Sequence, residues 1–181
     1  MSKHRGYYKV DDFRPFLNHP EKYHNPNNKP LVARSGLEMR WFRDLDENEN
    51  IILWSSECVH VPYQKPIFYT ENDSTIAYTE EHKYIVDLWM IWKNAGVEYE
   101  MLGEIKPESM CYPPKEPKIN NKKAMNNYHS AMQTFLINRS KWVSTFQFCK
   151  QLHESKNRPI SFVIMTETKI ENSKKILGIA Q

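Results

Sequence analysis

The chain lacks any long apolar run. None of its 181 residues lies in a stretch approaching the ~20 apolar residues of a membrane-spanning helix, so the sequence argues against a membrane protein. The N-terminus, Met-Ser-Lys-His-Arg-Gly-Tyr-Tyr, has basic residues but no apolar core, and is not expected to be a secretory signal. The formal charge of +3 is too small to identify a nucleic-acid binder.

Cysteine is also scarce. Cys58, Cys111 and Cys149 are an odd and scattered set, and no two of them form a CxxC pair. This pattern predicts reduced thiols in a cytoplasmic setting and argues against a zinc site.

What the chain does have is enough apolar material for one core. Hydrophobic residues make up 40% of the sequence and aromatic residues 13%, which excludes global disorder. The length predicts one domain. We expect an extended N-terminal arm over residues 1–30, a folded domain over 31–167 and a soft C-terminal tail over 168–181.

The first half of the expected domain begins with a helix. Ser35-Gly-Leu-Glu38 has the S-x-x-E form of a capping box, and Leu37, Trp41 and Leu45 would form its buried stripe. Residues 51–54 and 59–63 are short strand candidates, and the polar residues 64–83 read as a long hairpin loop.

The second half supplies the main strands and the longest helix. Residues 84–92 and 98–106 predict two antiparallel strands joined by an Asn-Ala-Gly turn. A proline-rich linker over 107–123 follows, then a helix over about 124–154 and a buried strand over 160–165. This order favours an α/β fold with a mixed central β-sheet flanked by helices.

Asp87, Glu104 and Lys106 carry the most informative chemistry. Asp87 lies in an apolar, aromatic run, and Glu104 and Lys106 share one face of the next strand because side chains alternate along strands. Mg²⁺ takes oxygen ligands and keeps several waters, so two carboxylates and a substrate phosphate suit it. The lysine could then orient a metal-bound water, which is the chemistry of phosphodiester hydrolysis.

A simpler interpretation stays open for this trio. An Asp, a Glu and a Lys on two paired strands can form a solvated face with a cross-strand ion pair. However, a carboxylate among apolar neighbours costs free energy when it has no partner. Burial of Asp87 therefore favours a metal ligand.

Two further groups of residues have both a structural and a functional interpretation. Glu38 either completes the capping box or faces the active site, and Glu57 is either a surface carboxylate or a residue that orders the site. Arg34 and Ser35 lie at a helix N-terminus, which attracts phosphate, although capping explains Ser35 equally well.

On the long helix, Asn138 and Lys141 share a face because they are three residues apart. That face is either solvated or runs beside a phosphate path.

Taken in order, these motifs resemble a known family. The chain is similar to the PD-(D/E)XK nucleases, and most closely to the head completion nucleases of T-even-like tailed phages, over about residues 20–167. The resemblance is carried by Arg34-Ser-Gly-Leu-Glu38, Trp54-Ser-Ser-Glu57, Val61-Pro-Tyr63, Tyr84-x-x-Asp87, Glu104-Ile-Lys-Pro107 and Asn138-x-x-Lys-Trp142. One departure is Val86, where the family usually has a proline before the aspartate.

The resemblance implies a restriction-endonuclease-like core and a metal-dependent DNA endonuclease. Glu38, Asp87, Glu104 and Lys106 would form the catalytic set, with Mg²⁺, or Mn²⁺ in its place, held by Asp87, Glu104 and the carbonyl oxygen of Ile105. Double-stranded DNA would be the substrate, contacted by Arg34, Ser35, Asn138 and Lys141.

The resemblance also implies a biological setting. The expected role is trimming or cutting DNA during phage head completion, in the host cytoplasm or in the virion, beside portal or neck proteins. Two alternatives are a structural head-completion or neck adaptor that keeps the nuclease fold, and a junction-resolving or transposase-type endonuclease. Oligomeric state is left open.

Overall fold

The computed structural model describes residues 9–26, 28–71, 74–119, 121–156, 159–167 and 170–172. Five strands form one sheet in the order β1-β2-β3-β4-β5. The pairings β1–β2, β2–β3 and β4–β5 are antiparallel, and β3–β4 is parallel. The predicted α/β class with a mixed sheet flanked by helices is therefore confirmed.

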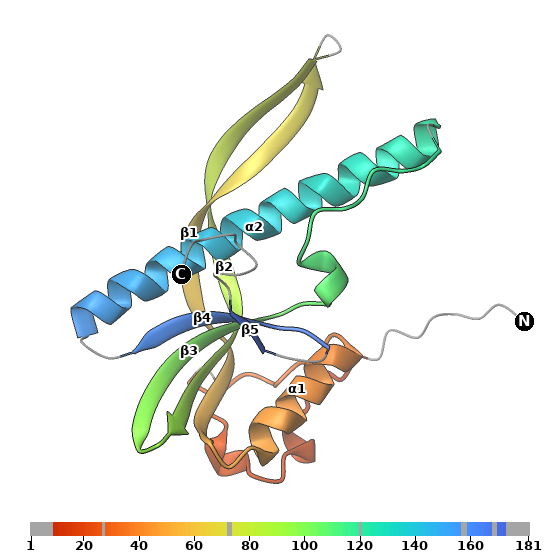
Figure 1. Cartoon of the computed structure of the whole chain (residues 1–181). Helices are drawn as coiled ribbons and strands as arrows, with labels where there is room; N and C mark the ends of the chain where they lie inside the picture. Colours follow the sequence, from red (N-terminus) through yellow and green to blue (C-terminus); the bar gives the residue numbers. More distant parts are fainter. Residues whose placement is uncertain are drawn as a thin grey trace, which may run out of the picture.

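Two helices cover opposite faces of this sheet (Figure 1). Helix α1 (Gly36–Glu47) packs on one face with a core that includes Phe42, Met101 and Ile105. Helix α2 (Lys122–Lys156) packs on the other face, with Trp142 beside Leu102. Met101 and Leu102 are neighbours on β3, so the alternation of side chains along a strand separates the two cores.

The residues before α1 pack against it without forming a strand of their own. Two 3-10 turns, η1 (Arg14–Phe16) and η2 (Pro20–Lys22), connect short bridges from Val10 to Ala33 and from Tyr23 to Trp54. Phe13 is 1% exposed, and its ring lies 5.8 Å from that of Phe42.

Helix α1 begins where the capping motif predicts, at the Ser35 N-cap. Its predicted stripe needs a correction, because Phe42 and Leu45 are buried whereas Leu37 and Trp41 are only partly buried. The reason is aromatic packing, since the Phe42 ring contacts those of Phe13 and Trp54. Trp41 instead donates its indole N–H to the carbonyl of Thr166, at 2.9 Å.

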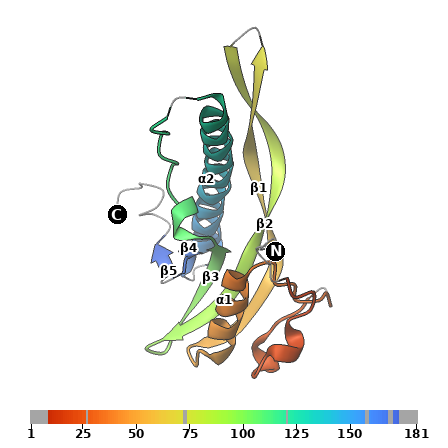
Figure 2. The same cartoon turned by 90° about the vertical axis from the view of Figure 1, so that its right-hand side faces the viewer.

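The expectation of two short strands and a polar loop over 64–83 is wrong. β1 (Ile51–Glu71) and β2 (Ser74–Asn94) are two 21-residue strands that pair along their length. Pro62 and Pro66 do not interrupt β1, because β1 is an edge strand and needs no ladder bond on its outer side. The far part of this hairpin projects beyond the body of the protein (Figure 1, Figure 2).

The later elements agree closely with the sequence. β3 (Val97–Ile105) and β4 (Ile160–Met165) are the predicted strands, and α2 is the predicted long helix extended by two residues at each end. Between β3 and α2, the proline-rich segment forms the 3-10 turn η3 (Glu108–Met110).

Beyond β4, residues 170–172 of the expected soft tail form β5 (Ile170–Asn172). The remainder of that tail, residues 168–169 and 173–181, lies outside the described residues. Within the part of the chain that the structure describes, no helix is both long enough and apolar enough to span a bilayer.

Candidate active site

The site is built where β2 separates from β3. The last paired residues are Leu88 and Gly103, so Asp87 is the first residue of β2 beyond that ladder. In place of a strand-to-strand bond, the backbone N–H of Ile105 donates to Oδ2 of Asp87 at 2.8 Å. The carboxylate therefore satisfies a backbone donor at the point where the sheet forks.

A bulge in β1 lies directly opposite Asp87. Ser56 pairs with Leu88 and Val59 with Val86, so Glu57 and Cys58 face the single residue Asp87. Bulges bend a strand and increase its twist. On β2, Val86 packs in the core beneath α2 and Leu88 in the core beneath α1, although residues two apart in a regular strand share a face. The regular alternation of β2 is therefore broken at Asp87.

The fork and the bulge enclose a polar cavity of about 140 Å³. It is contributed by the start of α1, the bulge of β1, the middle of β2 and the end of β3. Its lining residues are Arg34, Glu38, Phe42, Ser56, Glu57, Asp87, Ile105 and Lys106. Four predicted site side chains, those of Arg34, Glu38, Asp87 and Lys106, thus meet in one cavity, and Ile105 lines it with them.

Burial raises the pKa of Asp87 from 3.8 to about 6. The Ile105 N–H and the Lys106 ammonium lower the pKa of Asp87, while the carboxylates of Glu38 and Glu57 raise it further. The cavity therefore destabilises the negative charge of Asp87, and a bound cation would relieve that cost.

Glu104 and Lys106 form an ion pair within one segment, at the end of β3, and not the solvated cross-strand pair of the simpler interpretation. Glu104 is 2% exposed, and Nζ of Lys106 lies 3.0 Å from its Oε1. Burial lowers the pKa of Lys106, but the carboxylates of Glu104 and Asp87 outweigh that effect and raise it overall.

Glu104 has a second partner that the sequence did not assign. The Tyr84 hydroxyl donates a hydrogen bond to Oε2 of Glu104. Glu104 itself is not among the residues that line the cavity, so it meets the cavity through Lys106.

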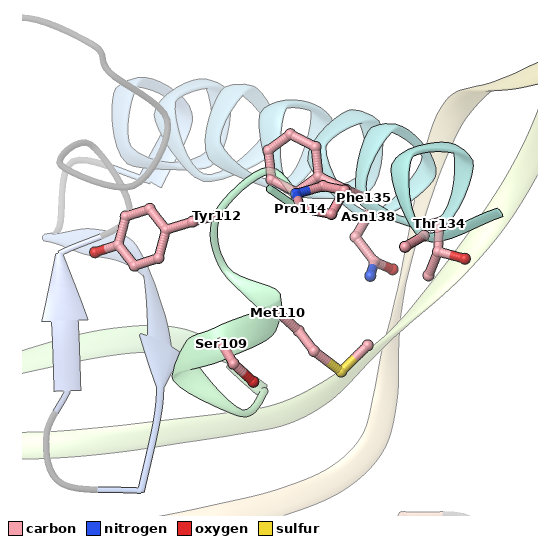
Figure 3. Close-up of a pocket in the computed structure, with 8 residues that line it drawn as sticks. Ser109, Met110, Tyr112, Pro114, Thr134, Phe135 and Asn138 are labelled. Atoms are coloured by element: carbon pink, nitrogen blue, oxygen red, sulfur yellow. The ribbon is translucent and has the colours of Figure 1, made fainter. Parts of the chain in front are cut away.

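Lys141 and Asn138, two of the predicted DNA-binding residues, do not line this cavity. The Lys141 ammonium lies 5.1 Å from the Tyr84 ring centroid and 5.9 Å from that of Tyr63, in cation–π contacts. Asn138 is 7% exposed and lines a separate hollow of about 240 Å³ between η3 and α2. Figure 3 shows its amide beside Met110 in that hollow.

Ser35 and Glu38 do form a helix cap. Oγ of Ser35 accepts the Glu38 N–H at 3.1 Å. The Glu38 carboxylate accepts the Ser35 hydroxyl at 3.1 Å and the Arg34 N–H at 2.8 Å, rather than the expected Ser35 N–H. Because Glu38 also lines the cavity, its capping and active-site interpretations are compatible.

Glu57 lines the same cavity and contacts Arg34, the residue before the cap. Its carboxylate forms a two-pronged ion pair with the Arg34 guanidinium, at 2.5 Å and 3.2 Å. The backbone of Glu57 has the left-handed conformation, with φ of 53°. That backbone costs a residue with a side chain about 1–2 kcal/mol, whereas exposed ion pairs contribute about 0–1 kcal/mol.

Sequence reasoning assigned no role to Ser56, Phe42 or Tyr84. For Ser56 and Tyr84 the available signal was their position inside the motif strings Trp54–Glu57 and Tyr84–Asp87. No sequence signal marked Phe42, which lines the cavity and packs against Phe13 and Trp54.

The donor set of the cavity suits a hard divalent cation. The acidic residues Asp87, Glu38 and Glu57 line it, with Glu57 paired to Arg34, and no cysteine or histidine does. Among the described residues, no three acidic, histidine or cysteine side chains converge as a complete metal cluster. Mg²⁺ needs only one or two carboxylates because it keeps several waters, so the residues present fit it.

The chain is similar to a curated protein, the head completion nuclease of Enterobacteria phage T4. The two are 29% identical over 139 residues, which cover 77% of this chain and 80% of the relative. The resemblance to head completion nucleases that the motifs predicted is thus confirmed. No protein-family model and no solved structure matches the chain, so PD-(D/E)XK membership stays a prediction.

Asp87→Asn should raise stability in metal-free buffer at pH 8. The folded pKa of about 6 lies above the value of 3.8 without the fold, so the native state holds more protons between pH 4 and 6 and loses stability as pH rises through that window. At 1.36 kcal/mol per pKa unit the gain is about 3 kcal/mol at pH 8, and it should shrink toward pH 4. Urea unfolding of parent and variant with EDTA measures this difference; a difference independent of pH would contradict it.

Tyr84→Phe should lower the free energy of unfolding by about 2 kcal/mol, because the buried Glu104 carboxylate loses a hydrogen bond. Tyr63→Phe is the matched control, since Tyr63 shares the Lys141 contact without being the Glu104 donor. Equal losses in urea unfolding for the two variants would show that the Tyr84 hydroxyl contributes nothing through Glu104.

Proposed function

We propose that this chain is a metal-dependent DNA endonuclease that acts in phage head completion. Its similarity to a protein named head completion nuclease supports the nuclease role and the setting. The observation that carries the chemistry is the cavity at the fork of the sheet, where the Asp87 carboxylate lies beside Glu38, Ile105 and Lys106.

Asp87 is the principal proposed ligand. Burial disfavours its charge, and a bound cation would offset that cost. Asp87 and the carbonyl oxygen of Ile105 would hold Mg²⁺, for which Mn²⁺ can substitute. Glu104, expected from the sequence to be a third ligand, does not line the cavity and would act through Lys106. When bound, the metal supplies charge neutralisation at the scissile phosphate and acidifies a coordinated water.

Lys106 orients the attacking water in this proposal. Glu104 holds its ammonium at 3.0 Å, and the Tyr84 hydroxyl holds Glu104 in turn. A charged group fixed in this way is preorganised, so it does not have to reorganise during the reaction. Glu38 is proposed as a second acidic residue of the catalytic set, since it lines the cavity with Asp87.

DNA would approach the open side of the cavity, where Arg34 is 54% exposed. Arg34 binds phosphate through its guanidinium, and Ser35 begins α1, whose N-terminus favours anions. Lys141 lies on α2, and we propose that it contacts double-stranded DNA farther along its path. Asn138, expected from the sequence to be a second contact there, is 7% exposed and is not part of this proposal. Portal or neck proteins are the proposed partners, in the host cytoplasm or in the virion.

Incubation with supercoiled, linear and branched DNA tests the proposed activity. Mg²⁺ or Mn²⁺ should support cleavage, and Ca²⁺ should bind without supporting turnover. Asp87→Ala should abolish cleavage, whereas Asp44→Ala, which removes an exposed carboxylate on α1, should leave it unchanged. If calorimetry detects no binding of divalent cations and the DNA is not cleaved, the result would favour the structural adaptor.

Lys106→Met should lose most of the rate while keeping metal and DNA binding, because the cation cannot itself ligate Mg²⁺. A positioned group of this kind contributes about 10²–10⁴-fold, or roughly 3–5 kcal/mol of barrier. Single-turnover cleavage at saturating enzyme and Mg²⁺ measures the loss, with Lys93→Met, at the exposed end of β2, as control. Weaker DNA binding with an unchanged rate would make Lys106 a phosphate contact.

A further inference from the structure

The contact between Arg34 and Glu57 has the geometry of phosphate recognition. Nη1 of Arg34 lies 2.5 Å from Oε1 of Glu57, and Nη2 lies 3.2 Å from Oε2. Two oxygens of a phosphate engage the same fork of a guanidinium. Glu57 therefore occupies the donors on Arg34 that a DNA phosphate would use.

The stability of the fold does not account for this carboxylate. Arg34 and Glu57 are 54% and 42% exposed, so their ion pair is screened by solvent. The left-handed backbone of Glu57 costs more than such a pair contributes. The bulge thus holds an acidic side chain at the wall of the cavity for little gain in folding stability.

Arg34 is also the accessible cation of the cavity. Lys106 is 22% exposed and is held by Glu104. A phosphate arriving from solvent meets Arg34 first and finds it already neutralised by Glu57.

We infer that Glu57 sets DNA affinity by acting as an internal substitute for phosphate on Arg34. The DNA backbone must displace Glu57 before Arg34 can bind it, so DNA that does not reach the cavity gains nothing from this cation. This inference rests on the proposed function, namely that the chain binds DNA at the cavity. Glu57 would be an affinity-setting residue that acts through Arg34.

The test measures binding of a labelled 20-base-pair duplex by fluorescence anisotropy in Ca²⁺ buffer, separately from cleavage. Glu57→Gln keeps the shape of the side chain and removes its charge, and should tighten binding about fivefold, which is about 1 kcal/mol at 1.4 kcal/mol per factor of ten. Glu98→Gln, at the exposed start of β3, changes the net charge equally and should leave affinity within about 1.5-fold. Glu57→Asn is a second variant, because asparagine tolerates the left-handed backbone.

A double-mutant cycle with Arg34→Gln locates the effect. In that background Glu57→Gln should no longer tighten binding, because the gain depends on Arg34. Weaker binding by both Glu57 variants, or a gain that persists without Arg34, overturns the inference while leaving the proposed function intact. Absence of DNA binding and cleavage in the parent chain overturns both.

Discussion

The site depends on one hydrogen bond, from the backbone N–H of Ile105 to the carboxylate of Asp87. It replaces a strand-to-strand hydrogen bond where β2 leaves β3, so the sheet can fork without leaving the Ile105 N–H unpaired. The fork lets β2 continue as a partner of β1 alone, and it opens the space beside Ile105 and Lys106. One acidic side chain is therefore both a structural substitute for a strand and the candidate metal ligand.

This double use has an energetic consequence. The half-buried carboxylate at the fork has a raised pKa, about 6, and its charge destabilises the metal-free protein. Lys106 offsets part of that cost from one side, and the proposed cation would offset more. Such conflict between stability and local charge is expected where a site performs chemistry.

Glu104 and Glu57 illustrate two other uses of a carboxylate at the same site. Glu104 is buried and held by Tyr84 and Lys106, so it fixes the position of the Lys106 ammonium. Glu57 is exposed, lies on a bulge and pairs with Arg34, so we infer that it competes with DNA phosphate for the Arg34 guanidinium. The difference follows from burial, because a solvated ion pair exchanges partners readily and a desolvated one does not.

The sequence by itself determined most elements of the fold and the chemical identity of the candidate site. Apolar runs and capping residues predicted α1, α2, β3 and β4, and the aspartate in an apolar strand with Glu-x-Lys on the next predicted the acidic site. These features are local, since they depend on periodicity within one element. Only the tertiary structure decided the rest. The long β1–β2 hairpin was missed because cross-strand pairing outweighs the local polarity of residues 64–83. The meeting of Arg34, Glu57 and Asp87 was also beyond the sequence, because a bulge acts through the register between two strands.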